Sequence, residues 1–395
     1  MVLPPPTLDR VASFDNLVAA YRKASVGRKR RDDIARFAMN WESRLLELQD
    51  ALLSGTYMPS PYRVFTVHEK KTRTIMSAPF IDRVVHHAIC NVLTPHLERS
   101  MSPHSCANRL GMGTRRGLEL FGRFAVRYRY VLKCDIKTFF PSIDRRILED
   151  LLLPKVGESR LAELVRSIIH AAPVSDTEPD WFEGDTLLTP MERPRGLPIG
   201  NMTSQTWANW YLNGLDHFIM DNRGFGAYVR YVDDFAVFGN DKEALGALKC
   251  DIVRYLQRLR LRLHTDKSRV YRTGDGVPFL GFRHYPSHRT IGKPNVRRFR
   301  RRIRAKVTAG IAPERIRSSI AGWAGFARMG NTSRVRARLY ARFGRLVEGR
   351  GVNVPRAAWG LVEQQQREPS LREPEQQQSR QQEQQQRVSL CIPPA

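Results

Sequence analysis

Cysteine is scarce in this sequence, and its few copies are not spaced as metal ligands. The 395-residue chain has five, an odd number, without any C-x-x-C pair (Cys90, Cys106, Cys134, Cys250 and Cys391). A disulfide framework uses an even, regularly spaced set, and a structural zinc site uses closely spaced pairs. The sequence therefore argues against both and predicts a reducing, cytoplasmic compartment.

Long apolar runs and targeting signals are also missing. No apolar run approaches the ~20 residues that a membrane-spanning helix needs. The first residues, Met-Val-Leu-Pro-Pro-Pro, contain neither the basic segment nor the apolar stretch of a signal peptide. We expect no secretory signal and no membrane partner, although binding of a basic surface to anionic lipid is a weaker alternative.

Acidic residues are too few to balance the basic ones. The chain has 65 Lys and Arg against 39 Asp and Glu, a formal charge of +26 with a pI near 10.5. Residues 286–350 alone hold 18 Lys and Arg against two acids, so +16 of this charge lies in one short segment. A focused basic patch attracts phosphates and releases their counterions, which favours a nucleic acid as the partner.

Apolar periodicity predicts an alternation of short strands and helices. Strands are expected at 63–67, 72–75, 130–134, 227–232, 235–238, 269–271 and 279–284, and helices at 11–53, 81–97, 145–153, 160–170, 206–220, 242–261 and 297–347. Strands separated by helices, together with an adjacent hairpin at 227–238, predict an α+β fold in which an antiparallel sheet has helices on one face. His86 and His87 lie in an apolar helical pattern without a second ligand pair, which favours packing over metal binding.

Composition also divides the chain into segments. Residues 1–54 are expected to be a helical N-terminal extension, 55–285 the main α+β domain, and 286–350 a basic helical domain. Residues 363–387 contain eleven Gln and almost no large apolar side chain. Such a composition buries too little surface to offset the entropy of ordering, so residues 351–395 are expected to be a disordered tail.

Three aspartates stand where strands end. Asp233 and Asp234 are adjacent at the apex between two β-rich runs, and Asp135 ends the apolar run 130–134. An isolated Asp-Asp pair is also good turn chemistry. If the strand ends are neighbours, however, the three anions repel unless a cation neutralises them, and carboxylates of this kind bind Mg²⁺. The pattern predicts two-metal phosphoryl transfer, which needs no protein nucleophile.

With these motifs in order, residues 55–345 resemble the reverse transcriptases. Tyr231-Val232-Asp233-Asp234 is similar to the Y-x-D-D box of the family, and Asp135 through Phe140 to its first metal-binding motif. Residues 82–89 and 106–113 resemble bacterial and group II intron-type members. The resemblance implies a right-hand fold of fingers, palm and helical thumb. It also implies that Asp135, Asp233 and Asp234 are catalytic and that two Mg²⁺ ions bind at Asp135, Ile136, Asp233 and Asp234.

The same resemblance assigns further roles. Phe140 would be the steric gate against a 2′-hydroxyl, Arg73 and Lys71 would hold the triphosphate, and Lys267 would lie near it. The turn at Phe279, Leu280 and Gly281 would be the primer grip. The substrates implied are template RNA, a DNA primer and dNTPs.

One loop departs from the pattern of the family. Most members resemble L-P-Q-G-x-x-x-S-P here, with the glutamine under the incoming nucleotide. This chain has Leu197-Pro-Ile-Gly-Asn-Met-Thr-Ser-Gln205, so Ile199 replaces the glutamine and Gln205 the proline, and Ile199, Gly200 and Gln205 are expected to line the nucleotide site. This form is similar to the reverse transcriptases of diversity-generating retroelements, which copy RNA with errors at adenines and usually work with a small basic accessory protein. A retron or phage-defence reverse transcriptase is the alternative, and a non-catalytic nucleic-acid-binding protein is the second.

Overall fold

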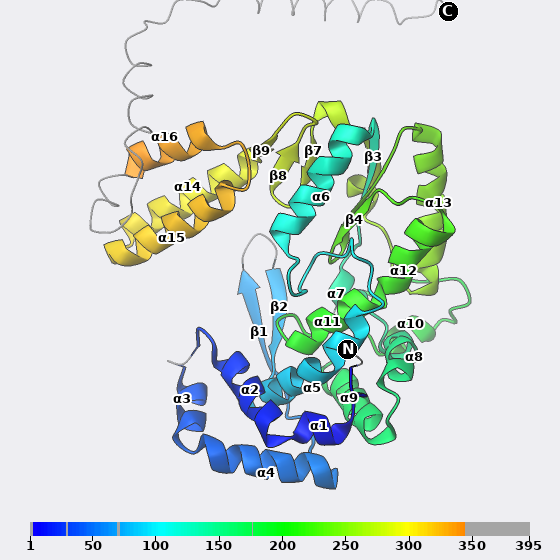
Figure 1. The fold of residues 1–395 in the computed structure, drawn as a ribbon, viewed down its shortest axis with the longest axis vertical. Helices are drawn as coiled ribbons and strands as arrows, with labels where there is room; N and C mark the ends of the chain where they lie inside the picture. Colours follow the sequence, from blue (N-terminus) through cyan, green and yellow to red (C-terminus); the bar gives the residue numbers. More distant parts are fainter. Residues whose placement is uncertain (1–2, 29–30, 69–71, 176, 344–395) are drawn as a thin grey trace, which may run out of the picture. The chain divides into compact units, whose positions relative to one another are not determined.

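The computed structural model describes residues 3–28, 31–68, 72–175 and 177–343 (Figure 1). The chain divides into two units, Met1–Thr290 and Ile291–Ala395, which are described separately. The glutamine-rich tail predicted at 351–395 lies outside the described residues. Within the described ranges, no helix combines the length and the apolar character needed to cross a membrane.

Five helices of the first unit pack together, some of them only through one another. These are α1 (Leu8–Ala12), α2 (Phe14–Ser25), α3 (Asp32–Met39), α4 (Trp41–Ser54) and the long α5 (Phe80–Glu98). Leu17 on α2 and Leu45 on α4 are fully buried, and the Asn16 side chain donates to the Ala88 carbonyl on α5. Gly55 ends α4 in the left-handed conformation that favours glycine.

A two-stranded antiparallel hairpin separates α4 from α5. It consists of β1 (Arg63–His68) and β2 (Thr72–Ser77), with Phe65 opposite Ile75. The strands expected at 63–67 and 72–75 are therefore confirmed, each slightly longer than predicted.

The central sheet has four antiparallel strands in the order β4-β5-β3-β6. The strands are β3 (Tyr130–Asp135), β4 (Tyr228–Tyr231), β5 (Asp234–Gly239) and β6 (Arg269–Arg272). The register pairs Tyr130 with Gly239 and Asp135 with Asp234, so the residue that ends β3 faces the residue that begins β5. This confirms the predicted α+β class.

Helices cover this sheet on both faces, so the prediction of helices on one face was wrong (Figure 1). Successive side chains of a strand point to opposite faces. Leu132 and Cys134 of β3 join a core that includes α13 (Lys242–Arg258), α11 (Met202–Tyr211) and α12 (Asn213–His217). Val131 joins a second core with Phe121 of α6 (Thr114–Arg127). Because the neighbouring strand β5 buries Phe235 and Val237 on one face and Ala236 and Phe238 on the other, both faces need a cover.

Two other helices of this unit, α8 (Arg145–Val156) and α9 (Ser159–Ala171), lie close to their predicted ranges. The short helices α7 (Phe139–Ser142) and α10 (Thr189–Glu192) were not predicted. The single helix predicted at 206–220 is wrong, because α11 starts at Met202, α12 follows after Leu212, and a π-helical turn, η1, covers Phe218–Asn222.

A three-stranded sheet follows, in the order β7 (Val277–Phe279), β8 (Phe282–His284) and β9 (Arg289–Ile291). The strand predicted at 279–284 is in fact the turn and second strand of a hairpin. Leu280 (φ 46°) and Gly281 (φ 84°) form its two-residue turn. Two positive φ angles suit the right-handed twist of a tight hairpin.

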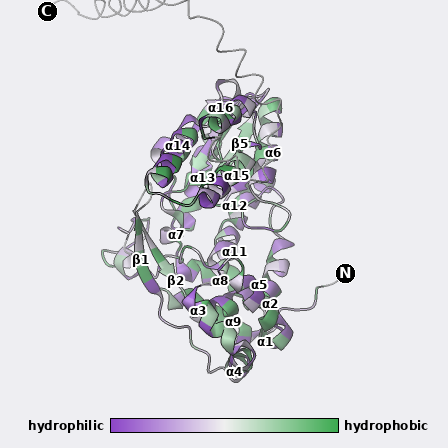
Figure 2. Ribbon diagram, turned by 90° about the vertical axis from the view of Figure 1, so that its left-hand side faces the viewer, coloured by the Kyte–Doolittle hydropathy of each residue, from purple (hydrophilic) through white to green (hydrophobic). Residues whose placement is uncertain are grey.

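In its described part, residues 291–343, the second unit contains three basic helices, α14 (Lys293–Thr308), α15 (Pro313–Ala327) and α16 (Ser333–Phe343). Phe299 of α14 stacks on Trp323 of α15 with ring centroids 4.6 Å apart, and the Trp323 indole donates to the Asn295 side chain. The hydrophilic colour of α14 in Figure 2 reflects its run of arginines, of which Arg301 and Arg304 are exposed. A small apolar contact thus supports a basic surface.

The buried histidine of α5 generates a prediction about stability. His86 is 1% exposed, and burial, followed by the charges of His87 and Arg83, lowers its pKa from 6.5 to about 3. The unfolded chain therefore binds more protons below pH 6.5, and the free energy of unfolding should fall as the pH drops from 6.5 toward 3, by up to ~1.4 kcal/mol per pH unit. His86→Gln should flatten this dependence in denaturant titrations, whereas the exposed His288→Gln should not. Equal slopes for wild type and His86→Gln would contradict the assignment.

Candidate active site

The two adjacent aspartates lie at a strained turn. Val232 and Asp233 connect β4 to β5, and Val232 has φ 59°. A β-branched residue is an outlier in the left-handed region, where an L-residue pays roughly 1–2 kcal/mol. Tight hairpins normally place glycine, asparagine or aspartate at such a position. The turn therefore stores strain that its surroundings must support.

Pairing between β3 and β5 brings the third aspartate to this turn. Asp135 lies opposite Asp234 in the antiparallel register, and the Ile136 amide donates to the Asp233 carbonyl at 3.2 Å. The three aspartates are only partly buried. By strand alternation Asp135 and Asp234 share the face of Val131 and Phe238, and α6 packs on that face. At one end Phe121 of α6 contacts Phe238, and at the other the Thr114 hydroxyl of α6 lies 3.2 Å from that of Tyr231, the residue paired with Asp234.

Two lysines neutralise the carboxylates. Lys267 Nζ lies 2.5 Å from Asp135 Oδ2, and Lys133 Nζ lies 2.9 Å from Asp234 Oδ1. Burial, which outweighs the opposing effect of Lys133, raises the pKa of Asp234 from 3.8 to about 6. Burial and the charge of Asp135 also raise the pKa of Asp233. The site thus concentrates negative charge that is costly unless cations are close.

Lys133 was missed by the sequence analysis. It is 8% exposed within a strand that is otherwise apolar, and a buried lysine needs a partner. That interruption of the apolar run was the available signal. In the part of the chain that the structure describes, no group of three or more His, Cys, Asp or Glu side chains is arranged to hold a metal ion.

The loop with Ile199 is attached to the segment that follows Asp135. The Leu197 amide donates to the Phe140 carbonyl at 2.9 Å, and the Gly196 amide donates to the Ile143 carbonyl at 2.8 Å. Phe140 itself is half-buried beside Phe139, which belongs to the core. The predicted steric gate and the predicted nucleotide loop are therefore neighbours through their backbones.

A buried arginine that the sequence analysis missed anchors this loop. Arg145 is 2% exposed and donates to the carbonyls of Gly196, Ala172 and Pro173 at 2.9, 2.7 and 2.6 Å. Ile199, half-buried, and Gly200, exposed with φ 112°, form the turn that follows. A Cβ added at Gly200 would meet no atom within 4 Å, so the glycine serves the backbone conformation and not a close contact.

Gln205 lies in the first turn of α11 and is half-buried. Its backbone N–H donates to the carbonyl of Asn201, the residue before the helix, at 3.3 Å. The Asn201 side chain donates to the Tyr62 hydroxyl at 3.1 Å. The first turn of α11 therefore links Gln205 to the loop that carries Ile199.

The predicted primer-grip residues separate into two roles. Phe279 is 2% exposed and stacks on Phe121, so it belongs to the core. Leu280 is half-buried, and both Leu280 and Tyr231 are close neighbours of Gly117 on α6. The turn of Leu280 and Gly281 therefore lies near the aspartate hairpin, whereas Phe279 supports it from within.

The predicted triphosphate ligands are described only in part. Lys71 lies outside the described residues. The backbone of Arg73 lies in β2, opposite Val67. Lys267 lies in a short 3-10 helix, η2 (Thr265–Lys267), which brings it to Asp135.

A second buried arginine, also missed, donates to the carbonyl of Val232 in the aspartate turn. Arg230 of β4 is 0% exposed and forms a two-pronged ion pair with Asp216 of α12, at 2.7 and 2.6 Å. Tyr228 donates its hydroxyl to the same carboxylate at 2.7 Å. A charged residue in the apolar run of β4 was the signal. Breaking such a buried pair typically costs ~3–5 kcal/mol.

Comparison with known proteins assigns the family. Residues 66–284, more than half of the chain, match the family described as reverse transcriptase (RNA-dependent DNA polymerase). Protein YkfC of Escherichia coli (strain K12) is 24% identical over 276 residues, which cover 60% of this chain and 70% of that protein. The retron Mx65 reverse transcriptase of Myxococcus xanthus is 30% identical over 155 residues, 39% of this chain and 35% of the relative.

Two further similarities are weaker or shorter. The group II intron-encoded protein LtrA of Lactococcus lactis subsp. cremoris is 25% identical over 182 residues, 45% of this chain and 28% of that protein. A solved partial Cas6-RT-Cas1–Cas2 complex is 22% identical with a TM-score of 0.37, covering 63% of this chain and 41% of that one. The chain thus spans about a third of the retron and group II intron proteins. The matched range contains β3, the β4–β5 hairpin and the β7–β8 turn, and the chain belongs to the reverse transcriptase family, the RNA-dependent DNA polymerases.

Proposed function

We propose that this chain extends a DNA primer on a template RNA, with Asp135, Asp233 and Asp234 as the catalytic carboxylates. The observation that carries the proposal is the pairing of β3 with β5, which sets Asp135 opposite Asp234 and bonds Ile136 to Asp233. A protein that only binds nucleic acid has no need for this costly concentration of anions. The same geometry therefore argues against the non-catalytic alternative.

We propose that two Mg²⁺ ions bind to this set of oxygen donors. Lysine ammonium groups pair with Asp135 and Asp234, which supports a place for positive charge at these carboxylates. Carboxylate oxygens are ligands that Mg²⁺ prefers, and the Ile136 carbonyl is a further candidate. When bound, the ions would supply charge neutralisation at the carboxylates and at the substrate phosphates.

The remaining residues would position the substrates. The Lys267 side chain is 45% exposed, so it can leave Asp135 and bind the triphosphate of the incoming dNTP. Arg73 and Lys71 would bind the same triphosphate, and Phe140 would exclude a 2′-hydroxyl. Leu280 and Gly281 would contact the primer end, supported by Phe279. Residues 286–350 would act as a thumb that binds the phosphate backbone.

We further propose that synthesis is error-prone at template adenines, as in diversity-generating retroelements. Ile199 occupies the place of the glutamine of the family, beside the segment that carries Phe140. A hydrocarbon side chain offers no hydrogen bond to the sugar or to the template base. The loss of such a contact, ~0.5–1.5 kcal/mol, weakens the rejection of a mismatched pair. A small basic accessory protein and a cytoplasmic location complete this proposal.

A retron-type function is the second candidate. The retron Mx65 reverse transcriptase is 30% identical to part of this chain, which favours this function directly. The two candidates share the carboxylates and differ in fidelity and in the template RNA. The error spectrum therefore distinguishes them.

The carboxylate assignment predicts the effect of Asp233→Asn. The variant should lose Mg²⁺-dependent primer extension on RNA by about 10³-fold or more, since several kcal/mol of charge stabilisation depend on the site. Its affinity for the template, measured by fluorescence anisotropy, should stay near that of wild type. Asp241→Asn, at the exposed start of α13, is the matched control and should extend normally. Retained extension by Asp233→Asn would remove the assignment.

The fidelity assignment predicts that Ile199→Gln lowers misincorporation opposite adenine by about 2–10-fold, the range that one polar contact supplies. Ile199→Leu, which keeps a hydrocarbon side chain, should leave the error rate unchanged. Sequencing of cDNA made on a defined RNA measures both. An unchanged error spectrum in the glutamine variant would show that this loop does not set fidelity.

The basic surface of the second unit predicts strongly salt-dependent template binding. Each phosphate contact contributes about −0.9 to the slope of log K against log salt for duplexes, and about −0.7 for single strands. Arg301→Gln and Arg304→Gln should therefore each make the slope shallower, whereas Lys242→Gln on α13 should not. A flat response of the wild type to salt would contradict the assignment of 286–350 as a thumb.

A further inference from the structure

One buried side chain, that of Arg230, bonds to the turn that carries Asp233. Arg230 Nη1 donates to the Val232 carbonyl at 3.1 Å, two residues along the same hairpin. That carbonyl belongs to the peptide that enters Asp233. The carbonyl of Asp233, in turn, accepts from the Ile136 amide on β3. The peptides on either side of Asp233 are thus each fixed by a hydrogen bond.

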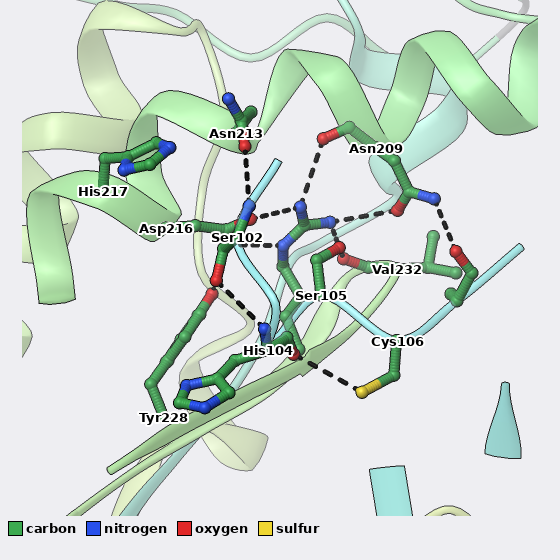
Figure 3. Close-up of polar contacts among 12 residues, drawn as sticks. Ser102, His104, Ser105, Cys106, Asn209, Asn213, Asp216, His217, Tyr228 and Val232 are labelled. Carbon is green, nitrogen blue, oxygen red and sulfur yellow. Dashed lines mark hydrogen bonds and ion pairs between the residues drawn. The ribbon is translucent and has the colours of Figure 1, made fainter. Parts of the chain in front are cut away.

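Every N–H group of the Arg230 side chain has an acceptor. Besides Val232, the guanidinium donates to both carboxylate oxygens of Asp216 and to the side-chain and backbone oxygens of Asn209. A guanidinium has five N–H donors in a rigid, planar fork, and five acceptors surround this one. Its position is therefore determined by bonds to α11, α12 and the turn. Figure 3 labels the three partners, Asn209, Asp216 and Val232.

The acceptors belong to residues that are themselves buried and hydrogen-bonded. Asp216 and Arg230 are 0% exposed and Asn209 is 1% exposed. The Asn209 amide donates to the Ala107 carbonyl at 2.8 Å, and the backbone of Arg230 bonds to His104 and Cys106 on both of its polar groups. The guanidinium thus connects the strained turn to a rigid base of two helices and a buried segment.

We propose that Arg230 is a positioning residue for Asp233. Its bond to the Val232 carbonyl holds Val232 in a backbone conformation that valine does not favour. This keeps Asp233 in place beside Asp135. This inference rests on the proposed function of Asp233 as a catalytic carboxylate. Arg230 itself, buried beneath the turn, does not touch the substrate.

The conservative variant Arg230→Lys tests the proposal. Lysine keeps the charge for Asp216 but lacks the fork, so it cannot bond Asp216, Asn209 and Val232 together. Tyr228→Phe is the matched control, because it removes one hydrogen bond from the same carboxylate without touching the turn. Both variants lower the thermal stability, and only Arg230→Lys releases Asp233.

The first measurement is hydrogen exchange of the Ile136 amide in metal-free protein. This amide bonds to the Asp233 carbonyl, so its exchange reports whether Asp233 stays attached to β3. Arg230→Lys is expected to raise the rate about tenfold, the factor for loss of one hydrogen bond, and Tyr228→Phe to leave it unchanged. The second measurement is Mn²⁺ binding without nucleic acid, by electron paramagnetic resonance, which should weaken about tenfold in Arg230→Lys alone.

A rescue variant separates positioning from general stability. Asparagine tolerates the left-handed conformation better than valine, so Val232→Asn in the Arg230→Lys background should restore slow exchange at Ile136. Should Arg230→Lys fail to fold, Asn209→Ala, which removes one acceptor of the fork, is expected to raise the same exchange rate. Wild-type exchange in whichever of these two variants folds, or no rescue by Val232→Asn where Arg230→Lys folds, overturns the proposal.

The proposed function can fail independently. If wild-type protein shows no Mg²⁺-dependent primer extension, the assignment of Asp233 fails whatever the exchange rates are. If wild type extends primers and Ile136 exchange is the same in wild type and the Arg230 or Asn209 variants, only the positioning role fails.

Discussion

The antiparallel pairing of β3 with β5 is the constraint on which the rest of the site depends. It sets Asp135 opposite Asp234 and bonds Ile136 to Asp233, so the three aspartates lie at one end of the sheet. Partial burial and mutual repulsion make their ionised forms costly, and the raised pKa values of Asp233 and Asp234 express that cost. Lys133 and Lys267 offset it. A site of this kind is stable only with cations close to it.

Buried arginines extend this constraint to the surrounding loops. Arg230 holds the aspartate turn and Arg145 holds the loop before Ile199, and both are almost completely buried. Removing a guanidinium from water is expensive unless its donors are satisfied, which forces the acceptors into defined positions. The two segments proposed to contact the nucleotide therefore owe their geometry to cations that the nucleotide does not meet.

Local sequence patterns predicted a helix or strand well where the apolar residues of one face, or one turn, fixed its limits. The hairpin at 63–77, helix α5 and helix α13 followed from periodicity. The predictions failed where tertiary contacts override periodicity. The helix expected at 206–220 is interrupted after Tyr211, and the strand expected at 279–284 contains a turn at Leu280 with positive φ. The sheet also carries helices on both faces, because β5 is apolar on each side.

The order of the motifs, the focused basic charge of 286–350 and the substitution of Ile199 were all determined by the sequence alone, since each is a property of neighbouring residues. Only the tertiary structure decided which lysine neutralises which aspartate and which arginine supports the turn. Lys133 and Asp234, like Arg230 and Asp216, meet through strand register and helix packing. Such contacts join residues that are distant in sequence or belong to different elements, and a local pattern carries no information about them.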